Sequence, residues 1–310
     1  MRRQQRLADD SLSVNFAGIC MRNPTMLASG FLGISMDLFR RLYKLNVGAF
    51  VTKSISTFPI EGYRNPTIVS LDNSGYLNAV GLANPGADAF SQEIGENYDL
   101  PILVSLAGSS DRDFPLIVKK FDGLNITGYE INLSCPHVAK MGMDVGDDPE
   151  MVYRVVKATK SCTTKPVFVK VGIGNADVLS VASAAKDAGA NGITAINTLR
   201  AMAIDIETGM PILSNKIGGL SGKPIKPLMI RCVYEITRQI RIPVIACGGI
   251  FEWEDAIEAM LAGASAVQLG SVIAAKGLAS FDAICLGMRT YLKRKSAKNV
   301  MEIIGYAHKY

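Results

Sequence analysis

Short apolar runs alternate with longer amphipathic segments along most of the chain. Most of the runs follow a Pro or a Gly, which ends the preceding loop, and several are apolar at consecutive positions. Such runs are expected of parallel strands whose outer face is covered by helices. We predict eight strands: PTMLAS (24–29), GAFVTK (48–53), PILVSL (101–106), GYEINL (128–133), PVFVKV (166–171), GITAIN (192–197), PVIACG (243–248) and SAVQLG (265–270).

The segments between these runs predict helices. The clearest helix start is Asp148-Pro149-Glu150, because Asp can cap a helix and Pro suits its first turn. The phrases DAGANGITAIN and LAGASAVQLG each close a helix on Ala-Gly-Ala before entering a strand, which indicates a repeated βα unit. The other predicted helices cover residues 111–121, 175–188, 227–240, 252–261 and 280–292.

A strand followed by a helix, repeated about eight times in one chain, is typical of the (β/α)8 TIM barrel. We therefore predict an α/β fold with one barrel domain over residues 1–310, in which residues 1–23 form an N-terminal extension or hairpin. The longest interruptions follow the second strand (54–100, with a helix of its own) and the sixth strand (198–226), and we predict insertions there. A doubly wound open sheet is the alternative, but no G-x-G-x-x-G follows the first strand.

Composition narrows the class of protein. Hydrophobic residues make up 48% of the 310 positions and charged residues 20%, which is typical of a globular chain. The net charge of +5 comes without a long basic run, so we expect no nucleic acid partner. The start, MRRQQRLADD, lacks the apolar core of a secretory signal, and no apolar stretch of about 20 residues occurs, so we expect a cytoplasmic protein with no membrane association.

The cysteines are scattered and never form C-x-x-C. This spacing argues against zinc, against a disulfide framework and against an iron–sulfur cluster held by this chain alone, and we predict no metal site. They are Cys20, Cys135, Cys162, Cys232, Cys247 and Cys285.

Polar residues at the strand ends are the candidates for chemistry, because the carboxyl ends of barrel strands meet at one mouth. The glycines after the last two strands stand where many barrels bind phosphate, since Gly lets backbone amides approach an anion. A tight turn is the alternative explanation for Gly248-Gly249. In chain order the ends give Ser29-Gly30, Lys53-Ser54, Ser105, Asn132 with Cys135 beyond, Lys170, Asn197-Thr198, Gly248-Gly249 and Gly270-Ser271.

Lys53 and Lys170 each end an otherwise apolar strand. Solvation explains either lysine alone, but two lysines at a phosphate-binding mouth indicate counter-charges for an anionic ligand. Asn132 and Asn197, with the segment NAVGLANPG (78–86), supply amides that can pair with the alternating N–H and C=O groups of a planar cyclic imide. Loop capping is the ordinary alternative for these asparagines.

Cys135 admits three interpretations: an inert small hydrophobe, a nucleophile activated by His137, or a general base toward a carbon acid. A cysteine hydrolase would also need an orienting third residue and an oxyanion hole, and the sequence indicates neither. As a thiolate near lysines, Cys135 could accept a proton without forming a covalent bond.

Taken in order, these segments resemble the class 1 dihydroorotate dehydrogenases, which are flavin enzymes of pyrimidine biosynthesis. The resemblance covers nearly the whole chain, and residues 200–227 are most similar to the 1B branch, whose catalytic subunit pairs with an electron-transfer partner. The matching phrases are NPTMLASG (23–30), NAVGLANPG (78–86), EINLSCP (130–136), INTLRAMAIDIETGMPIL (196–213), GGLSGKPIKP (218–227), IPVIACGGI (242–250) and GASAVQLGS (263–271).

The resemblance implies oxidation of (S)-dihydroorotate to orotate in de novo pyrimidine biosynthesis, with the hydride transferred to FMN and the C5 proton to Cys135. The implied FMN-binding residues are Ser29, Lys53, Ser54, Ser105, Asn132, Lys170, Ile196, Gly222, Gly248, Gly249, Gly270 and Ser271. The implied substrate-binding residues are Lys53, Asn78, Ala79, Val80, Gly81, Leu82, Asn132, Asn197 and Thr198.

The resemblance also implies a homodimer, with an iron–sulfur flavoprotein electron-transfer subunit as a possible partner. It leaves open whether NAD through that partner, fumarate or another soluble oxidant is the final electron acceptor. A phosphate-binding barrel enzyme without flavin is an alternative from another class, and a colourless preparation would indicate it.

Two positions depart from the family pattern. His137 follows Cys135-Pro136 where Asn is usual, and the loop after it lacks the usual Gly-Gly run. This loop is similar to the flavin domain of dihydropyrimidine dehydrogenases, so reduction of uracil or thymine is the alternative function. Ser105 stands where an Asn at the flavin is common, and Ser can still donate and accept one hydrogen bond.

Overall fold

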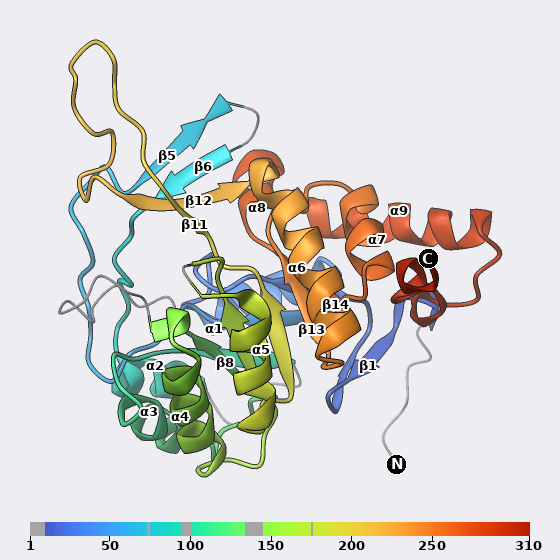
Figure 1. The fold of residues 1–310 in the computed structure, drawn as a ribbon, viewed down its shortest axis with the longest axis horizontal. Helices are drawn as coiled ribbons and strands as arrows, with labels where there is room; N and C mark the ends of the chain where they lie inside the picture. Colours follow the sequence, from blue (N-terminus) through green and yellow to red (C-terminus); the bar gives the residue numbers. More distant parts are fainter. Residues whose placement is uncertain (1–9, 73–74, 95–100, 134–144, 175) are drawn as a thin grey trace.

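Eight parallel strands close into a barrel (Figure 1). The computed structural model describes residues 10–72, 75–94, 101–133, 145–174 and 176–310. The strands neighbour one another in the order β10-β13-β14-β3-β4-β7-β8-β9, so the predicted fold class and all eight predicted strands are confirmed. Their bounds are β3 (Thr25–Leu27), β4 (Ala49–Val51), β7 (Ile102–Ala107), β8 (Gly128–Asn132), β9 (Val167–Val171), β10 (Gly192–Ala195), β13 (Val244–Cys247) and β14 (Ala266–Leu269).

Helices follow the barrel strands and pack around the sheet (Figure 1). The predicted start at Asp148 is confirmed: its side chain accepts a hydrogen bond from the Glu150 amide at 3.0 Å, and Pro149 occupies the first turn. Two helices, α1 and α8, were not predicted. The bounds are α1 (Met36–Lys44), α2 (Ala87–Glu93), α3 (Asp113–Phe121), α4 (Pro149–Lys160), α5 (Val178–Asp187), α6 (Lys226–Gln239), α7 (Trp253–Leu261), α8 (Ser271–Lys276) and α9 (Ser280–Arg294).

A four-stranded antiparallel sheet stands beside the barrel, in the order β11-β12-β6-β5 (Figure 1). β5 (Ile68–Leu71) and β6 (Gly75–Asn78) lie between β4 and β7 along the chain. β11 (Leu199–Ala201) and β12 (Gly218–Gly222) lie between β10 and β13, and β12 pairs with β6 in a register that sets Ser221 against Tyr76. Two chain segments far apart in sequence therefore build one sheet.

A hairpin of β1 (Val14–Phe16) and β2 (Ile19–Met21) packs against the main hydrophobic core. Val14 and Phe16 are buried while Asn15 between them is exposed, as expected of a strand with one face on the core. The Phe16 ring meets Phe168 of β9 edge-on at 5.9 Å between ring centroids. The short 3-10 helices are η1 (Asp10–Leu12), η3 (Val145–Asp147), η4 (Lys223–Ile225), η5 (Val300–Ile303) and η6 (Tyr306–Lys309).

The barrel strands are buried along their length, and most of their side chains are apolar. The buried polar exceptions on or next to these strands are Thr25, Thr52, Ser105, Glu130, Asn132, Lys170, Thr194 and Gln268. Burying such groups is costly unless each of them finds a hydrogen-bond partner. Within the described ranges, no helix is both long and apolar enough to cross a membrane.

Candidate active site

A cavity of about 720 Å³ opens at the carboxyl ends of the barrel strands. Its wall is formed by residues that follow β3, β4, β10, β13 and β14, and residues of the four-stranded sheet complete the enclosure. Most of the predicted site residues meet in this one wall. They are Ser29, Lys53, Ser54, Asn78, Ala79, Val80, Gly81, Leu82, Asn132, Lys170, Ile196, Asn197, Thr198, Gly248, Gly249, Gly270 and Ser271.

Two of the predicted residues that the structure describes are not among those that line the cavity. Ser105 is fully buried behind Ser54, with the two hydroxyl oxygens 2.9 Å apart. Gly222 ends β12 with a φ of 91°, directly after the cavity-lining Ser221. Cys135 lies outside the described residues.

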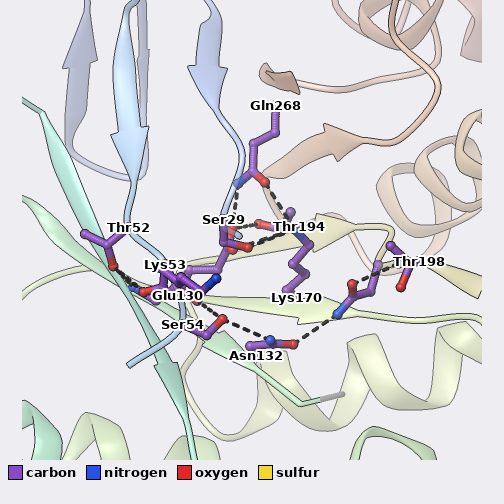
Figure 2. Close-up of polar contacts among 12 residues, drawn as sticks. Ser29, Thr52, Lys53, Ser54, Glu130, Asn132, Lys170, Thr194, Thr198 and Gln268 are labelled. Atoms are coloured by element: carbon purple, nitrogen blue, oxygen red, sulfur yellow. Dashed lines mark hydrogen bonds and ion pairs between the residues drawn. The ribbon is translucent and has the colours of Figure 1, made fainter. Parts of the chain in front are cut away.

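A row of hydrogen-bonded side chains crosses the cavity floor (Figure 2). The Asn132 amide nitrogen donates to Ser54 Oγ at 3.0 Å, and its amide oxygen accepts from Asn197 Nδ2 at 3.0 Å. The Asn197 oxygen accepts from the backbone amide of Thr198 at 2.8 Å. Because each amide is oriented by its neighbours, the row presents fixed donors and acceptors to a planar polar ligand.

Lys53 brings a positive charge to the cavity. Its side chain is half-buried, and burial lowers the pKa of the ammonium group. Among the residues that the structure describes, no carboxylate lies within 4.0 Å of this nitrogen. Lys53 is therefore suited to pair with a carboxylate that the ligand itself supplies.

Lys170 is deeply buried in the same floor (Figure 2). Its Nζ donates to Ser29 Oγ at 3.1 Å and to Gln268 Oε1 at 3.4 Å, and it lies 4.0 Å from Glu130 Oε1. Burial opposes the charge of Lys170, but the Cys247 sulfur and the Glu130 carboxylate outweigh burial, so its pKa lies above the ordinary value. Unlike Lys53, this lysine already has an internal counter-charge.

The glycine loops after β13 and β14 shape the other end of the cavity. Gly248 and Gly249 have φ values of 119° and 74°, which L side chains rarely adopt. A Cβ atom built on Gly249 would lie 2.5 Å from the Lys226 Cβ, so η4 and α6 approach this loop too closely for any side chain. In the described part of the chain, the amides of Gly249 and Gly270 donate no backbone hydrogen bond, so they are available to an anion. This cradle, with α8 starting at Ser271, fits a phosphate group.

The charge of the cavity wall is positive. Lys53, Lys170 and Arg200 line it, and no Asp or Glu is among its described lining residues. Such a wall favours a ligand or a pair of ligands with several negative charges.

Several lining residues were not predicted as site residues. Gln268 and Cys247 lie inside strands, and the only sequence signal was a polar or sulfur-containing residue within an apolar run. Tyr76 of β6 and Arg200 of β11 reach the cavity from the four-stranded sheet, and Tyr63 reaches it from the segment before β5. No local pattern in the sequence indicated the pairing of this sheet.

Comparisons with known proteins agree with this geometry. A sequence model of the family described as "Dihydroorotate dehydrogenase" matches residues 11–292. A protein of Pyrococcus furiosus named "Dihydroorotate dehydrogenase B (NAD(+)), catalytic subunit" is 45% identical over 300 residues, which cover 96% of this chain and 99% of the relative. Proteins of the same name from Pyrococcus abyssi and Methanocaldococcus jannaschii are 46% identical over 299 residues and 41% identical over 303 residues, covering 96% of this chain and 99% and 98% of the relatives.

Proposed function

Because the chain belongs to the dihydroorotate dehydrogenase family, we propose that its cavity oxidises (S)-dihydroorotate to orotate, a reaction of pyrimidine biosynthesis. The observation that carries this proposal is the meeting of three features in one wall: the Lys53 ammonium, which has no described carboxylate within 4.0 Å, the oriented amide row and the glycine cradle. A carboxylate-bearing cyclic imide beside a phosphate-bearing cofactor needs all three. Reduction of uracil or thymine, the alternative, gives Lys53 no carboxylate to bind and is not favoured by the relatives' names.

FMN is the proposed cofactor. Its phosphate would bind at Gly222, Gly248-Gly249 and Gly270-Ser271, and its ring system would contact Ser29, Lys53, Ser54, Ser105, Asn132, Lys170 and Ile196. The amides of Gly249 and Gly270 and the Lys170 charge support this assignment. When bound, FMN supplies the two-electron acceptor that no protein side chain provides.

The substrate-binding residues have separate tasks in this proposal. Lys53 pairs with the substrate carboxylate. Asn132, Asn197 and Thr198, with the segment Asn78–Leu82, hold the ring N–H and C=O groups. The Asn78 amide donates to the Gly219 carbonyl at 3.1 Å, which supports a fixed position for this segment against β12.

Cys135 is the proposed base that accepts the C5 proton. The cavity-lining Asn132 precedes it by three residues, a stretch of chain that spans at most about 11 Å, which supports Cys135 as a residue within reach of the substrate. Pro136 and His137 follow it in the sequence, so His137 is the nearest titratable neighbour along the chain.

We also propose a homodimer in the cytoplasm that delivers its electrons to a separate subunit. The names of the relatives describe a catalytic subunit and NAD(+). The sequence of this chain contains no dinucleotide-binding G-x-G-x-x-G after its first strand and no cysteine spacing for an iron–sulfur cluster. An iron–sulfur flavoprotein subunit is the partner that would supply both.

Anaerobic bleaching of the flavin by dihydroorotate, repeated with dihydrouracil, tests the proposal. We expect only dihydroorotate to bleach the protein. In Cys135→Ala the bleaching rate is expected to fall by about 10²–10⁴-fold, because a general base contributes that much, while orotate still binds. A colourless protein, or bleaching by dihydrouracil alone, would contradict the proposed function.

A further inference from the structure

A carboxylate is buried inside the barrel beneath the cavity, and the proposed chemistry gives it no task. Glu130 of β8 is fully buried. It precedes Asn132 by two residues, so both side chains point into the barrel interior, with Glu130 one layer deeper. Its Oε2 accepts hydrogen bonds from Thr194 Oγ1 at 2.8 Å and from Gln268 Nε2 at 2.6 Å (Figure 2).

The other carboxylate oxygen of Glu130 faces Lys170. This Oε1 has no hydrogen-bond partner among the described residues, and it lies 4.0 Å from Lys170 Nζ. A buried charge that keeps one oxygen free of hydrogen bonds is costly unless a nearby opposite charge compensates for it. The ammonium of Lys170 is that opposite charge.

Gln268 connects the two charges from across the barrel. It lies on β14, which is not a neighbour of β8 or β9. Its amide nitrogen donates to Glu130, and its amide oxygen accepts from Lys170 at 3.4 Å. The donor end of the amide therefore faces the anion and the acceptor end faces the cation, which fixes the orientation of both charged groups.

The cluster has one side on the cavity and one side in the core. Lys170 and Gln268 line the cavity, whereas Glu130 and Thr194 do not. The groups that face Lys170 are Ser29 from the loop after β3, Glu130 from β8, Cys247 from β13 and Gln268 from β14. Burial raises the pKa of the Cys247 thiol, and among the described residues Glu130 is the carboxylate that lies within 4.0 Å of the Lys170 ammonium.

We propose that Glu130 is a positioning residue that keeps Lys170 charged and aimed at the cavity, where the ammonium stabilises the negative charge that reduction leaves on the flavin. This inference rests on the proposed function, because it requires the cofactor to occupy this cavity. A merely structural ion pair would stabilise the barrel but would not set the charge of the cavity floor.

The test is the midpoint potential of the bound flavin, measured without substrate from about pH 6 to about pH 9, a range in which a buried lysine without a counter-charge can titrate. In the wild type, Lys170 stays charged and adds no inflection to the profile. Glu130→Gln keeps the shape of the side chain but removes its charge. We expect a new inflection in the profile of this variant, at the pH where Lys170 loses its charge. Above this pH, Lys170 takes up a proton when the flavin is reduced, up to one proton per two electrons.

Three further variants test whether the inflection depends on the Glu130 charge and on the Lys170 ammonium. Thr194→Val removes a hydrogen bond to the same carboxylate but leaves its charge, so its profile is expected to match the wild type. Glu130→Asp keeps the negative charge, so its profile is expected to lack the inflection seen in Glu130→Gln. The double variant Glu130→Gln/Lys170→Gln is expected to lack the inflection as well, because the titrating ammonium is gone.

The outcomes decide whether Glu130 positions Lys170 or forms a merely structural ion pair with it. A Glu130→Gln profile identical to the wild type, or an inflection that persists in the double variant, overturns the inference. If Glu130→Gln does not fold, the double variant is expected to fold, since removing both charges of a buried pair is often tolerated, and its failure to fold overturns the pairing. A wild type that dihydroorotate does not reduce overturns the proposed function instead, and the substrate-free potential measurement remains interpretable.

Discussion

Two lysines of one cavity differ in how they are compensated. Burial lowers the pKa of Lys53, which has no described carboxylate within 4.0 Å, whereas the surroundings of Lys170 raise its pKa. A lysine with its own counter-ion contributes a fixed charge, while a lysine without one gains most from a charged ligand. At the residue scale this difference supports the proposed roles of Lys53 toward the substrate and of Lys170 toward the cofactor.

Replacing Lys53 by Met is expected to weaken substrate recognition. The lost charge-assisted hydrogen bond amounts to about 1.5–3 kcal/mol, which lowers kcat/KM for dihydroorotate by about 10- to 150-fold. Steady-state kinetics with a soluble dye as acceptor measures this change. Lys119→Met, the same substitution on an exposed position of α3, is the matched control and should leave kcat/KM unchanged. Equal values for both variants would contradict the role of Lys53.

The pKa of Lys53 also predicts a pH dependence. A lysine is charged below its pKa, and here the pKa lies below the ordinary value, so the charge is lost earlier as pH rises. Because dihydroorotate stays anionic, its KM is expected to increase toward alkaline pH. In Lys53→Arg the guanidinium stays charged, so KM should not increase toward alkaline pH. This expectation concerns the pH dependence of KM, because the longer side chain can also change KM at neutral pH. A wild-type KM that does not change up to about pH 10 would argue against it.

At the scale of elements, the loop after β13 depends on backbone conformation. Gly249 has a φ of 74° and no room for a Cβ beside Lys226. In Gly249→Ala, positive φ costs about 1–2 kcal/mol, and the loop must move its amides away from the phosphate. We expect a lower Tm and a fall of about tenfold or more in FMN affinity. Gly123→Ala is the control, because a Cβ there meets no atom within 4 Å. Full FMN affinity in Gly249→Ala would exclude this loop from the phosphate site.

The barrel strands could be predicted because they are short and mainly apolar and most of them follow Pro or Gly, and these signals are local. Helix α8 escaped prediction because it is six residues long and starts directly after the β14 turn. The four-stranded sheet could not be predicted for a different reason. β12, with the sequence GGLSG, has little intrinsic preference for a strand, and its partner β6 is more than 100 residues away.

The residues of the candidate site also divide into those that local signals predict and those that depend on distant partners. Residues at strand ends could be predicted because the carboxyl ends of barrel strands converge. Glu130 and Gln268 could not, since a polar residue inside a buried strand has meaning only once its partners on other strands are known. Arg200 required the position of β11 over the mouth of the cavity.

At the scale of the whole molecule, the barrel accounts for the oxidation of the substrate but not for the proposed delivery of electrons to a separate subunit. The cavity at the strand ends is lined by residues suited to a phosphate-bearing flavin and a small anion, and the sequence carries no dinucleotide-binding fingerprint after its first strand. We therefore expect the purified chain alone to be bleached by dihydroorotate and reoxidised by a soluble dye, but not by NAD.

Adding an iron–sulfur flavoprotein subunit should restore reoxidation by NAD, because that subunit would contain the cofactors that this chain lacks motifs for. The measurement is anaerobic stopped-flow absorbance of the flavin, with NADH formation followed in parallel. The dye reaction is the internal control, since it shows that the reduced flavin can give up its electrons. If the isolated chain formed NADH as fast as it reduced the dye, the barrel itself would have to bind the dinucleotide, and a separate electron-transfer subunit would be unnecessary.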